Sequence, residues 1–135
     1  MSATDPIREV RTDAAPAPVG PYSQAVAHGG LLYASGQIPL VPETGQLVEG
    51  DAEAQTRQVL ANLGAVLRAG GSGFEHALKV TIYLTDIADF PRVNALYAEA
   101  FSGDPAPARA TVQVAALPLG AAVEMDAVAR IVDGG

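Results

Sequence analysis

The sequence contains no cysteine, and this single absence excludes disulfides, thiolate metal sites and cysteine nucleophiles together. It also contains no tryptophan, and aromatic residues make up only 5% of its 135 residues. The core must therefore be packed from valine, leucine, isoleucine and alanine. The two histidines, His28 and His76, are isolated from each other, so we expect no histidine-rich metal site and predict no bound metal.

Positive charge is scarce as well, with 8 Lys and Arg against 15 Asp and Glu and a net charge of −7. No basic stripe is present, which argues against a nucleic-acid partner because binding a phosphate backbone needs one. No apolar run approaches the roughly 20 residues of a membrane span, and the N-terminus lacks a basic-then-apolar signal. We therefore expect a soluble, cytoplasmic protein that binds neither nucleic acid nor a membrane.

A chain of this length fits one domain, which we expect to span residues 1–135 with residues 1–6 as a flexible tail. Alternation of apolar and polar residues, the period of a half-buried strand, is the main strand signal. The predicted strands are 7–12, 22–28, 31–37, 78–85, 107–114 and 121–132. Gly29 and Gly30 separate the second strand from the third, and such a pair predicts a tight hairpin because both turn positions need positive φ.

Helical spacing of apolar residues predicts helices over 51–69 and 89–101. Asp51 is a candidate cap for the start of the first helix, and Gly70-Gly71 is its stop signal. The resulting order, β-β-β-α-β-α-β-β, predicts an α+β domain in which two helices pack on one face of a six-stranded mixed sheet.

The other face of this sheet has no cover in one chain. We expect it to carry Tyr83, Thr111, Val128 and Val132 beside the charges. This surface is too apolar to be fully wet, so the pattern favours burial against other subunits.

Two of the predicted strands carry a notable set of charges. Arg109 shares one face of its strand with Thr111, whereas Glu124 and Asp126 lie opposite the apolar residues of the last strand. If these strands are neighbours, the arginine and the carboxylates stand on one sheet face, opposite the core. That face is then either a solvated surface or a small anion site with a built-in base, and the residues alone leave both open.

Five segments, taken in order, resemble the RidA (YjgF/YER057c/UK114) family over roughly Ile7 to Val132. They are residues 20–25 (GPYSQA), 35–39 (SGQIP), 93–97 (VNALY), 107–109 (PAR) and 123–125 (VEM). The resemblance implies a chorismate-mutase-like fold and a homotrimer whose sheets form a central barrel. It also implies sites in the clefts between adjacent subunits.

The resemblance further implies a 2-iminobutanoate/2-iminopropanoate deaminase. Such enzymes hydrolyse 2-aminoacrylate and 2-iminopropionate to 2-oxo acids and ammonia, without a metal or an organic cofactor. By this resemblance Arg109 binds the substrate carboxylate and Glu124 positions the attacking water. The pocket-lining positions implied are Tyr22, Ser35, Gly36, Asn94 and Thr111, and the last stands where many members have cysteine.

These residue types suit the chemistry, because a guanidinium binds a carboxylate bidentately and a carboxylate orients and deprotonates water. Ordinary roles remain open beside this one: Arg109 as a solvated rim residue, Glu124 as a surface charge and Tyr22 as a packing residue. The alternative function is a non-catalytic trimeric module that binds a small carboxylate in the same cleft, or a holdase. Nucleic-acid cleavage ranks third because of the acidic charge.

Overall fold

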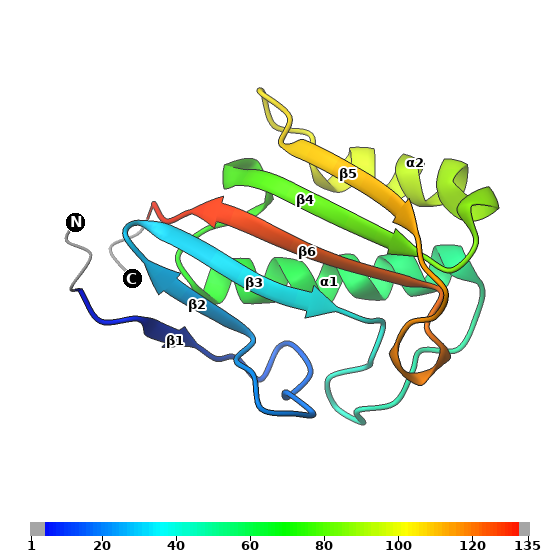
Figure 1. Cartoon of the computed structure of the whole chain (residues 1–135), viewed down its shortest axis with the longest axis horizontal. Helices are drawn as coiled ribbons and strands as arrows, with labels where there is room; N and C mark the ends of the chain where they lie inside the picture. Colours follow the sequence, from blue (N-terminus) through cyan, green and yellow to red (C-terminus); the bar gives the residue numbers. More distant parts are fainter. Residues whose placement is uncertain (1–4, 133–135) are drawn as a thin grey trace.

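The computed structural model of the chain describes residues 5–132, so most of the predicted flexible tail, residues 1–4, lies outside the described part. Strands and helices follow one another in the predicted order (Figure 1). The strands are β1 (Arg8–Val10), β2 (Ala25–His28), β3 (Leu31–Gln37), β4 (Ala77–Leu84), β5 (Ala108–Gln113) and β6 (Val123–Arg130). The helices are α1 (Ala52–Ala69) and α2 (Phe90–Ala100).

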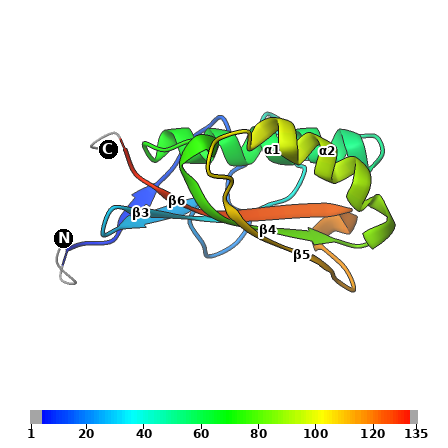
Figure 2. The ribbon, with the colours of Figure 1, turned by 90° about the horizontal axis from the view of Figure 1, so that it is seen from above.

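The strands form one six-stranded sheet in the order β1-β2-β3-β6-β4-β5. All neighbours are antiparallel except β4 and β5, which are parallel and are connected through α2. Both helices lie on the same side of the sheet (Figure 2). The predicted mixed sheet with two helices on one face is therefore confirmed.

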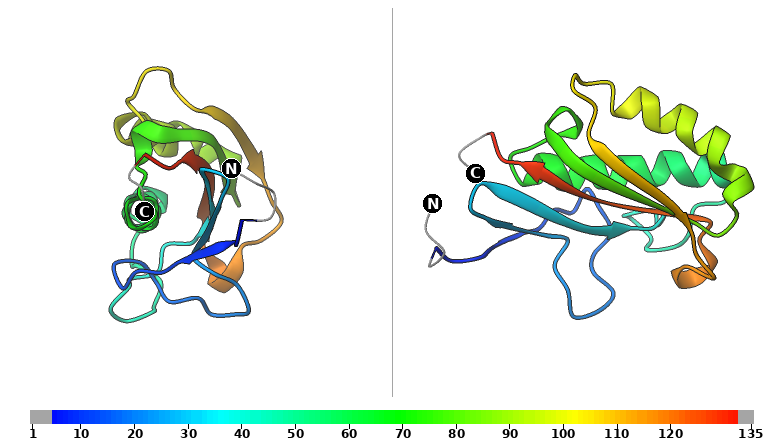
Figure 3. Two further views of the ribbon diagram at one scale, coloured as in Figure 1. Left: turned by 90° about the vertical axis from the view of Figure 1, so that its left-hand side faces the viewer. Right: turned by 45° about the horizontal axis from the view of Figure 1, so that its top comes forward.

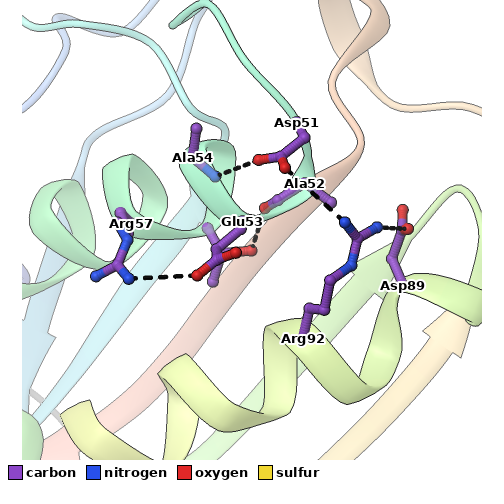
Figure 4. A network of polar contacts seen from close by, with 8 residues as sticks. Asp51, Ala52, Glu53, Ala54, Arg57, Asp89 and Arg92 are labelled. Carbon is purple, nitrogen blue, oxygen red and sulfur yellow. Dashed lines mark hydrogen bonds and ion pairs between the residues drawn. The ribbon is translucent and has the colours of Figure 1, made fainter.

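Local signals in the sequence form the predicted turns and caps. Gly29 and Gly30 have φ of 61° and 80° in the hairpin between β2 and β3. The Asp51 carboxylate accepts a hydrogen bond from the Ala54 backbone N–H at 3.0 Å and so caps α1. Arg92 of α2 lies 3.9 Å from Asp51 and 2.6 Å from Asp89, so it links the start of α1 to α2 (Figure 4).

The core lies between the helices and the sheet. Alternate residues of β4 and β6 are fully buried against the buried face of α1. The residues less than 1% exposed include Val59, Leu63, Val66, Leu67, Val80, Ile82, Leu84, Val123 and Met125. This packing fixes which face of each strand points to the helices and which points to the open side.

The structure corrects the predicted relation between Arg109 and the carboxylates. β4 lies between β5 and β6, so the two charged strands are not neighbours. Val80 pairs with Arg109 in the β4–β5 register, whereas Tyr83 pairs with Glu124 in the β4–β6 register. Paired residues point to the same sheet face. Arg109 therefore points to the helix side with buried Val80, and Glu124 points to the open side.

Thr111 is corrected in the same way. It pairs with buried Ile82 and so lies on the helix side, not on the open face where we expected it. Tyr83 and Val128 do lie on the open side, and Val132 lies beyond the end of β6. The open face also presents Tyr33 and Val112, which are 46% and 42% exposed. The predicted uncovered apolar face is thus present, with a different membership.

Candidate functional site

A pocket of about 380 Å³ opens on the uncovered side of the sheet, where β3 and β6 meet two loops. Its floor comes from the two strands, and its rim comes from the proline-rich connector before β2 and the turn before β6. The lining residues are Val19, Tyr22, Ser35, Gly36, Ile38, Pro118 and Glu124. Of the predicted site residues, Tyr22, Ser35, Gly36 and Glu124 are brought together here.

Gly36 and Glu124 are in intimate contact across β3 and β6. A Cβ atom built on Gly36 would overlap the Glu124 carboxylate. The register between β3 and β6 shifts between Ala34 and Gln37, so Gly36 lies in an irregular stretch of β3 that makes room for this side chain. The glycine therefore allows the carboxylate to lie directly on the strand backbone.

The surroundings of Glu124 favour its protonated form. Burial raises the pKa of the Glu124 carboxyl above its ordinary value of 4.5, and the negative charge of Asp126 raises it further. Asp126 itself accepts a hydrogen bond of 2.8 Å from the Tyr83 hydroxyl, and this bond raises the pKa of Tyr83. A carboxylate with a raised pKa is a stronger proton acceptor than an exposed one.

The other two predicted site residues in the pocket, Ser35 and Tyr22, form hydrogen bonds with backbone groups. The Ser35 hydroxyl donates to the Ser23 carbonyl at 2.7 Å, which ties β3 to the connector. The Tyr22 hydroxyl accepts from the Val19 N–H at 3.3 Å, and Tyr22 is 48% exposed. We expected Tyr22 in a strand, but β2 begins only at Ala25, and the Tyr22 N–H donates to the Gly20 carbonyl at 2.9 Å in a local turn instead of to a neighbouring strand. Tyr22 is therefore a rim residue on a loop.

A second cluster forms around Arg109 on β5. This strand is at the edge of the sheet, and its ribbon runs beside that of α2 (Figure 3). The Arg109 guanidinium donates to the Asn94 side-chain oxygen at 2.6 Å. Its Cζ atom lies 4.8 Å from the centre of the Tyr97 ring and 5.3 Å from that of Phe90. The ion pairs found within residues 5–132 leave Arg109 without a carboxylate partner. Its orientation is thus fixed while its charge stays available to an anion.

Thr111 lies on the same side of β5 as Arg109, but its hydroxyl oxygen is buried and finds no hydrogen-bond partner among the described residues. The Tyr97 hydroxyl is also buried and has no hydrogen-bond partner among the described residues. Burial raises the pKa of Tyr97, and the positive charge of Arg109 opposes this rise. Sequence reasoning missed Phe90 and Tyr97 as partners of Arg109. The helical spacing of apolar residues over 89–101 includes Tyr97, and nothing in that spacing indicates an arginine above its ring.

Sequence reasoning also missed the apolar part of the pocket, formed by Val19, Ile38 and Pro118. Val19 and Ile38 lie in loops and Pro118 begins a one-turn 3-10 helix, where periodicity gives no direction. Within the described part of the chain no group of three or more His, Asp or Glu residues could hold a metal ion. No helix there is long and apolar enough to span a membrane.

The fold and these clusters define a class: a small α+β protein with an acidic pocket on an open sheet face and an oriented arginine on the edge strand. Residues 12–131 match the Endoribonuclease L-PSP family. The chain belongs to this family, also called the YjgF/RidA family.

Two relatives can be aligned with this chain along most of its length. The chain is 48% identical over 120 residues to mouse 2-iminobutanoate/2-iminopropanoate deaminase, covering 89% of this chain and 88% of the mouse protein. It is 47% identical over 132 residues to the chloroplastic Reactive Intermediate Deaminase A of Arabidopsis thaliana, covering 97% and 70% respectively. Because that relative is named as chloroplastic, the cytoplasmic location of this chain stays a prediction.

A solved structure confirms the fold. YyfA of Yersinia pestis, a Rid-family protein of unknown function, superposes with a TM-score of 0.90 at 49% identity. The alignment covers 93% of this chain and 100% of that one. The α+β architecture of this chain is therefore that of the Rid proteins.

Proposed function

We propose that the chain hydrolyses reactive enamine/imine intermediates to 2-oxo acids and ammonia, in sites that two subunits of a homotrimer share. The observation that carries the proposal is the split of the machinery into two incomplete halves. The pocket around Glu124 is lined by no basic residue, and Arg109 is an oriented cation without a carboxylate partner among the described residues. The name of the mouse relative supplies the reaction.

The two halves cannot meet on one small substrate within a single chain. Arg109 points to the helix side of edge strand β5, and Glu124 points to the open side with β4 between them. A second copy that places its β5 edge beside the pocket would bring its arginine to the carboxylate. The apolar open face, with Tyr33 and Val112 exposed, supports such an assembly because packing of these faces removes apolar surface from water.

In the assembled site, Arg109 of one subunit binds the carboxylate of a 2-imino acid through two parallel N–H···O bonds. Asn94 holds the guanidinium in the orientation that this requires. The substrate lies in the pocket of the neighbouring subunit, where Tyr22, Ser35 and Gly36 form the walls around Glu124. Thr111 follows Arg109 on the same side of β5 and completes the arginine half.

The reaction then needs one water and one base. Glu124 takes a proton from water as the water oxygen attacks C2 of the C=N bond, and it delivers this proton to the nitrogen, which gives a tetrahedral amino alcohol. Glu124 then moves the hydroxyl proton of the amino alcohol to the same nitrogen as the C–N bond breaks, so that ammonia leaves and the C=O bond of the 2-oxo acid forms. A 2-aminoacrylate substrate first takes a proton at C3 and releases one from nitrogen, and so becomes 2-iminopropionate. The imine carbon is itself electrophilic, so protein groups and water carry every step.

A coupled assay tests the proposal. An amino-acid oxidase generates imines from a series of amino acids, semicarbazide traps the imine that remains, and the purified protein competes with the trap. We expect the wild type to suppress the semicarbazone. Arg109→Ala should lose about 10- to 100-fold in efficiency, since a charge-assisted contact contributes roughly 1.5–3 kcal/mol.

Arg57→Ala is the matched control, because Arg57 is an exposed arginine on α1 that forms an ion pair with Glu53 and is not among the pocket-lining residues. It should behave as the wild type. If the wild type forms trimers and binds 2-oxo acids but does not lower the semicarbazone signal, the deaminase proposal is wrong. The non-catalytic small-carboxylate-binding module would then be the better account.

A further inference from the structure

Three loop segments form or lead into the walls of the pocket, and each is hydrogen-bonded to a buried carboxamide side chain. The three carboxamides belong to Gln24, Asn62 and Gln55, which are 1%, 0% and 8% exposed. None of them lines the pocket. They therefore stand behind its walls.

Gln24 holds the connector that carries the rim residues Val19 and Tyr22. Its Oε1 accepts from the Thr12 N–H at 2.7 Å. Its Nε2 donates to the carbonyls of Thr12, Ala15 and Pro16 at 3.0, 3.3 and 2.9 Å. One side chain thus satisfies the backbone of a proline-rich segment that forms neither helix nor strand.

Asn62 holds the segment that follows β3. Its Nδ2 donates to the carbonyls of Leu40 at 2.9 Å and of the pocket residue Ile38 at 3.3 Å. The bond from Nε2 of Gln58 to Oδ1 of Asn62, at 2.9 Å, fixes the orientation of this amide.

Gln55 holds the backbone just ahead of Glu124. Its Oε1 accepts from the Ala122 N–H at 2.8 Å, and the Ala122 carbonyl accepts from the Thr85 N–H at 3.2 Å. Ala122 is therefore fixed from both sides, two residues before the carboxylate. Helix α1, which has no residue in the pocket lining, sets the position of this segment through one side chain.

We propose that Gln24, Asn62 and Gln55 are positioning residues of the active site, and that Gln55 sets the placement of Glu124 through Ala122. Each carboxamide satisfies backbone groups that the irregular segments leave unpaired, so each contributes to stability. What these three share is that each bonds a segment that forms or leads into a pocket wall. The inference rests on the proposed deaminase function, because it concerns the geometry of that site.

Gln55 offers the sharpest test because its bond uses only an acceptor. Gln55→Met removes the acceptor, and Gln55→Asn keeps an amide that is too short to reach. Gln55→Glu keeps an acceptor oxygen near the start of α1, where the helix dipole favours negative charge. Thr56→Val is the matched control, since Thr56 is the next residue, is 0% exposed and donates only to the Ala52 carbonyl within α1.

The measurements are kcat and KM in the semicarbazide assay, the melting temperature, and hydrogen exchange at the Ala122 amide. We expect Gln55→Met and Gln55→Asn to lose about 10-fold or more in kcat, because small displacements of a catalytic group are costly, with faster exchange at Ala122. Gln55→Glu should restore most of kcat. Thr56→Val should lower the melting temperature and leave kcat unchanged.

Two results would overturn the inference. In one, Gln55→Met and Gln55→Asn exchange faster at Ala122 yet keep the wild-type kcat. In the other, Thr56→Val lowers kcat as much as the two Gln55 variants do when it lowers the melting temperature by the same amount. Failure of the proposed function is separate, since it shows as an inactive wild type in the same assay.

Discussion

At the scale of single residues, Gly36 gives the most selective way to disturb the pocket. A Cβ at this position meets the Glu124 carboxylate, which is the far end of a flexible side chain. We therefore expect Gly36→Ala to displace Glu124 without unfolding the protein. A shift of this size should lower kcat/KM by about 100-fold, measured in the imine assay together with the melting temperature.

Gly103→Ala is the control for this substitution. Its added Cβ would meet Glu75 at 3.4 Å, an ordinary van der Waals distance, far from the pocket. Wild-type kinetics for Gly36→Ala would show that the carboxylate position is unimportant.

Asn94 tests whether the charge of Arg109 is used. Asn94→Ala removes the 2.6 Å hydrogen bond and frees the guanidinium to move, so we expect KM to rise by about 5- to 10-fold. Asn94→Asp keeps a partner for Arg109 but neutralises its charge toward an anionic substrate. KM should therefore rise further in Asn94→Asp than in Asn94→Ala. Equal or reversed effects would argue against carboxylate binding by Arg109.

Glu124 links activity to pH. As the base it works ionised, so kcat/KM should fall as the pH drops through its pKa, which burial and Asp126 raise above 4.5. Asp126→Asn removes the smaller cause, so the acidic limb of the pH–rate profile should move to lower pH by part of the shift. An acidic limb that does not move in Asp126→Asn would show that another group is responsible.

The same pKa shift has a consequence for stability. Because the pKa of Glu124 is raised in the folded state, that state binds the proton more tightly than the unfolded chain does. Stability is therefore lost as the pH rises from about 4.5 through the raised pKa of Glu124, and it stays constant above that pKa. We expect Glu124→Gln to melt higher than the wild type at pH 7, with the gain vanishing near pH 4.

The sequence predicted the grouping of the candidate residues better than the sheet face on which they lie. Tyr22, Ser35, Gly36 and Glu124 gather in one pocket, and Arg109 contacts Asn94 as a separate pair. The face of Arg109 was not predictable, because the residues of β5 are all exposed or half-buried. Because neither face of β5 is apolar and buried, the residue pattern of this strand does not indicate which face the helices cover.

At the scale of elements, strong local signals gave correct elements. The alternation in β6 matches burial residue by residue, and that in β4 matches it from Lys79 to Leu84, whereas Leu78 is 45% exposed at the register shift between Ala77 and Lys79. The glycine pair makes the β2–β3 hairpin. Strand order was the weak point, since β5 returns through α2 to lie parallel to β4 and leaves β6 on the other side. That order depends on contacts between distant segments, which periodicity does not encode.

The junction of α1 and α2 is an element-scale prediction. The Asp51 carboxylate caps α1 and lies near Arg92, and its hydrogen bond to the Ala54 N–H lowers its pKa (Figure 4). Asp51→Ala should lower the melting temperature by about 4 °C, whereas Asp51→Asn, which keeps a cap, should lower it much less. The lowered pKa means that the wild type loses this contribution as the pH falls below 3.8, a loss that Asp51→Asn should not show.

At the scale of the whole molecule, the account depends on copies of the chain completing one another. One protomer presents a carboxylate pocket on its open face and an arginine on the opposite side of its edge strand. The net charge of −7 makes this arginine a rare cation on an acidic protein, suited to one small anion better than to a nucleic-acid backbone.

The most direct test of this claim is complementation between two inactive variants. Arg109→Ala and Glu124→Gln are purified alone and after co-expression, and each preparation is assayed for imine hydrolysis. If each site takes its arginine from one subunit and its carboxylate from the next, random mixed trimers should recover about a quarter of the wild-type sites, because one of four pairings restores both groups. Mixed trimers that stay as inactive as the two parents would contradict a site shared between subunits.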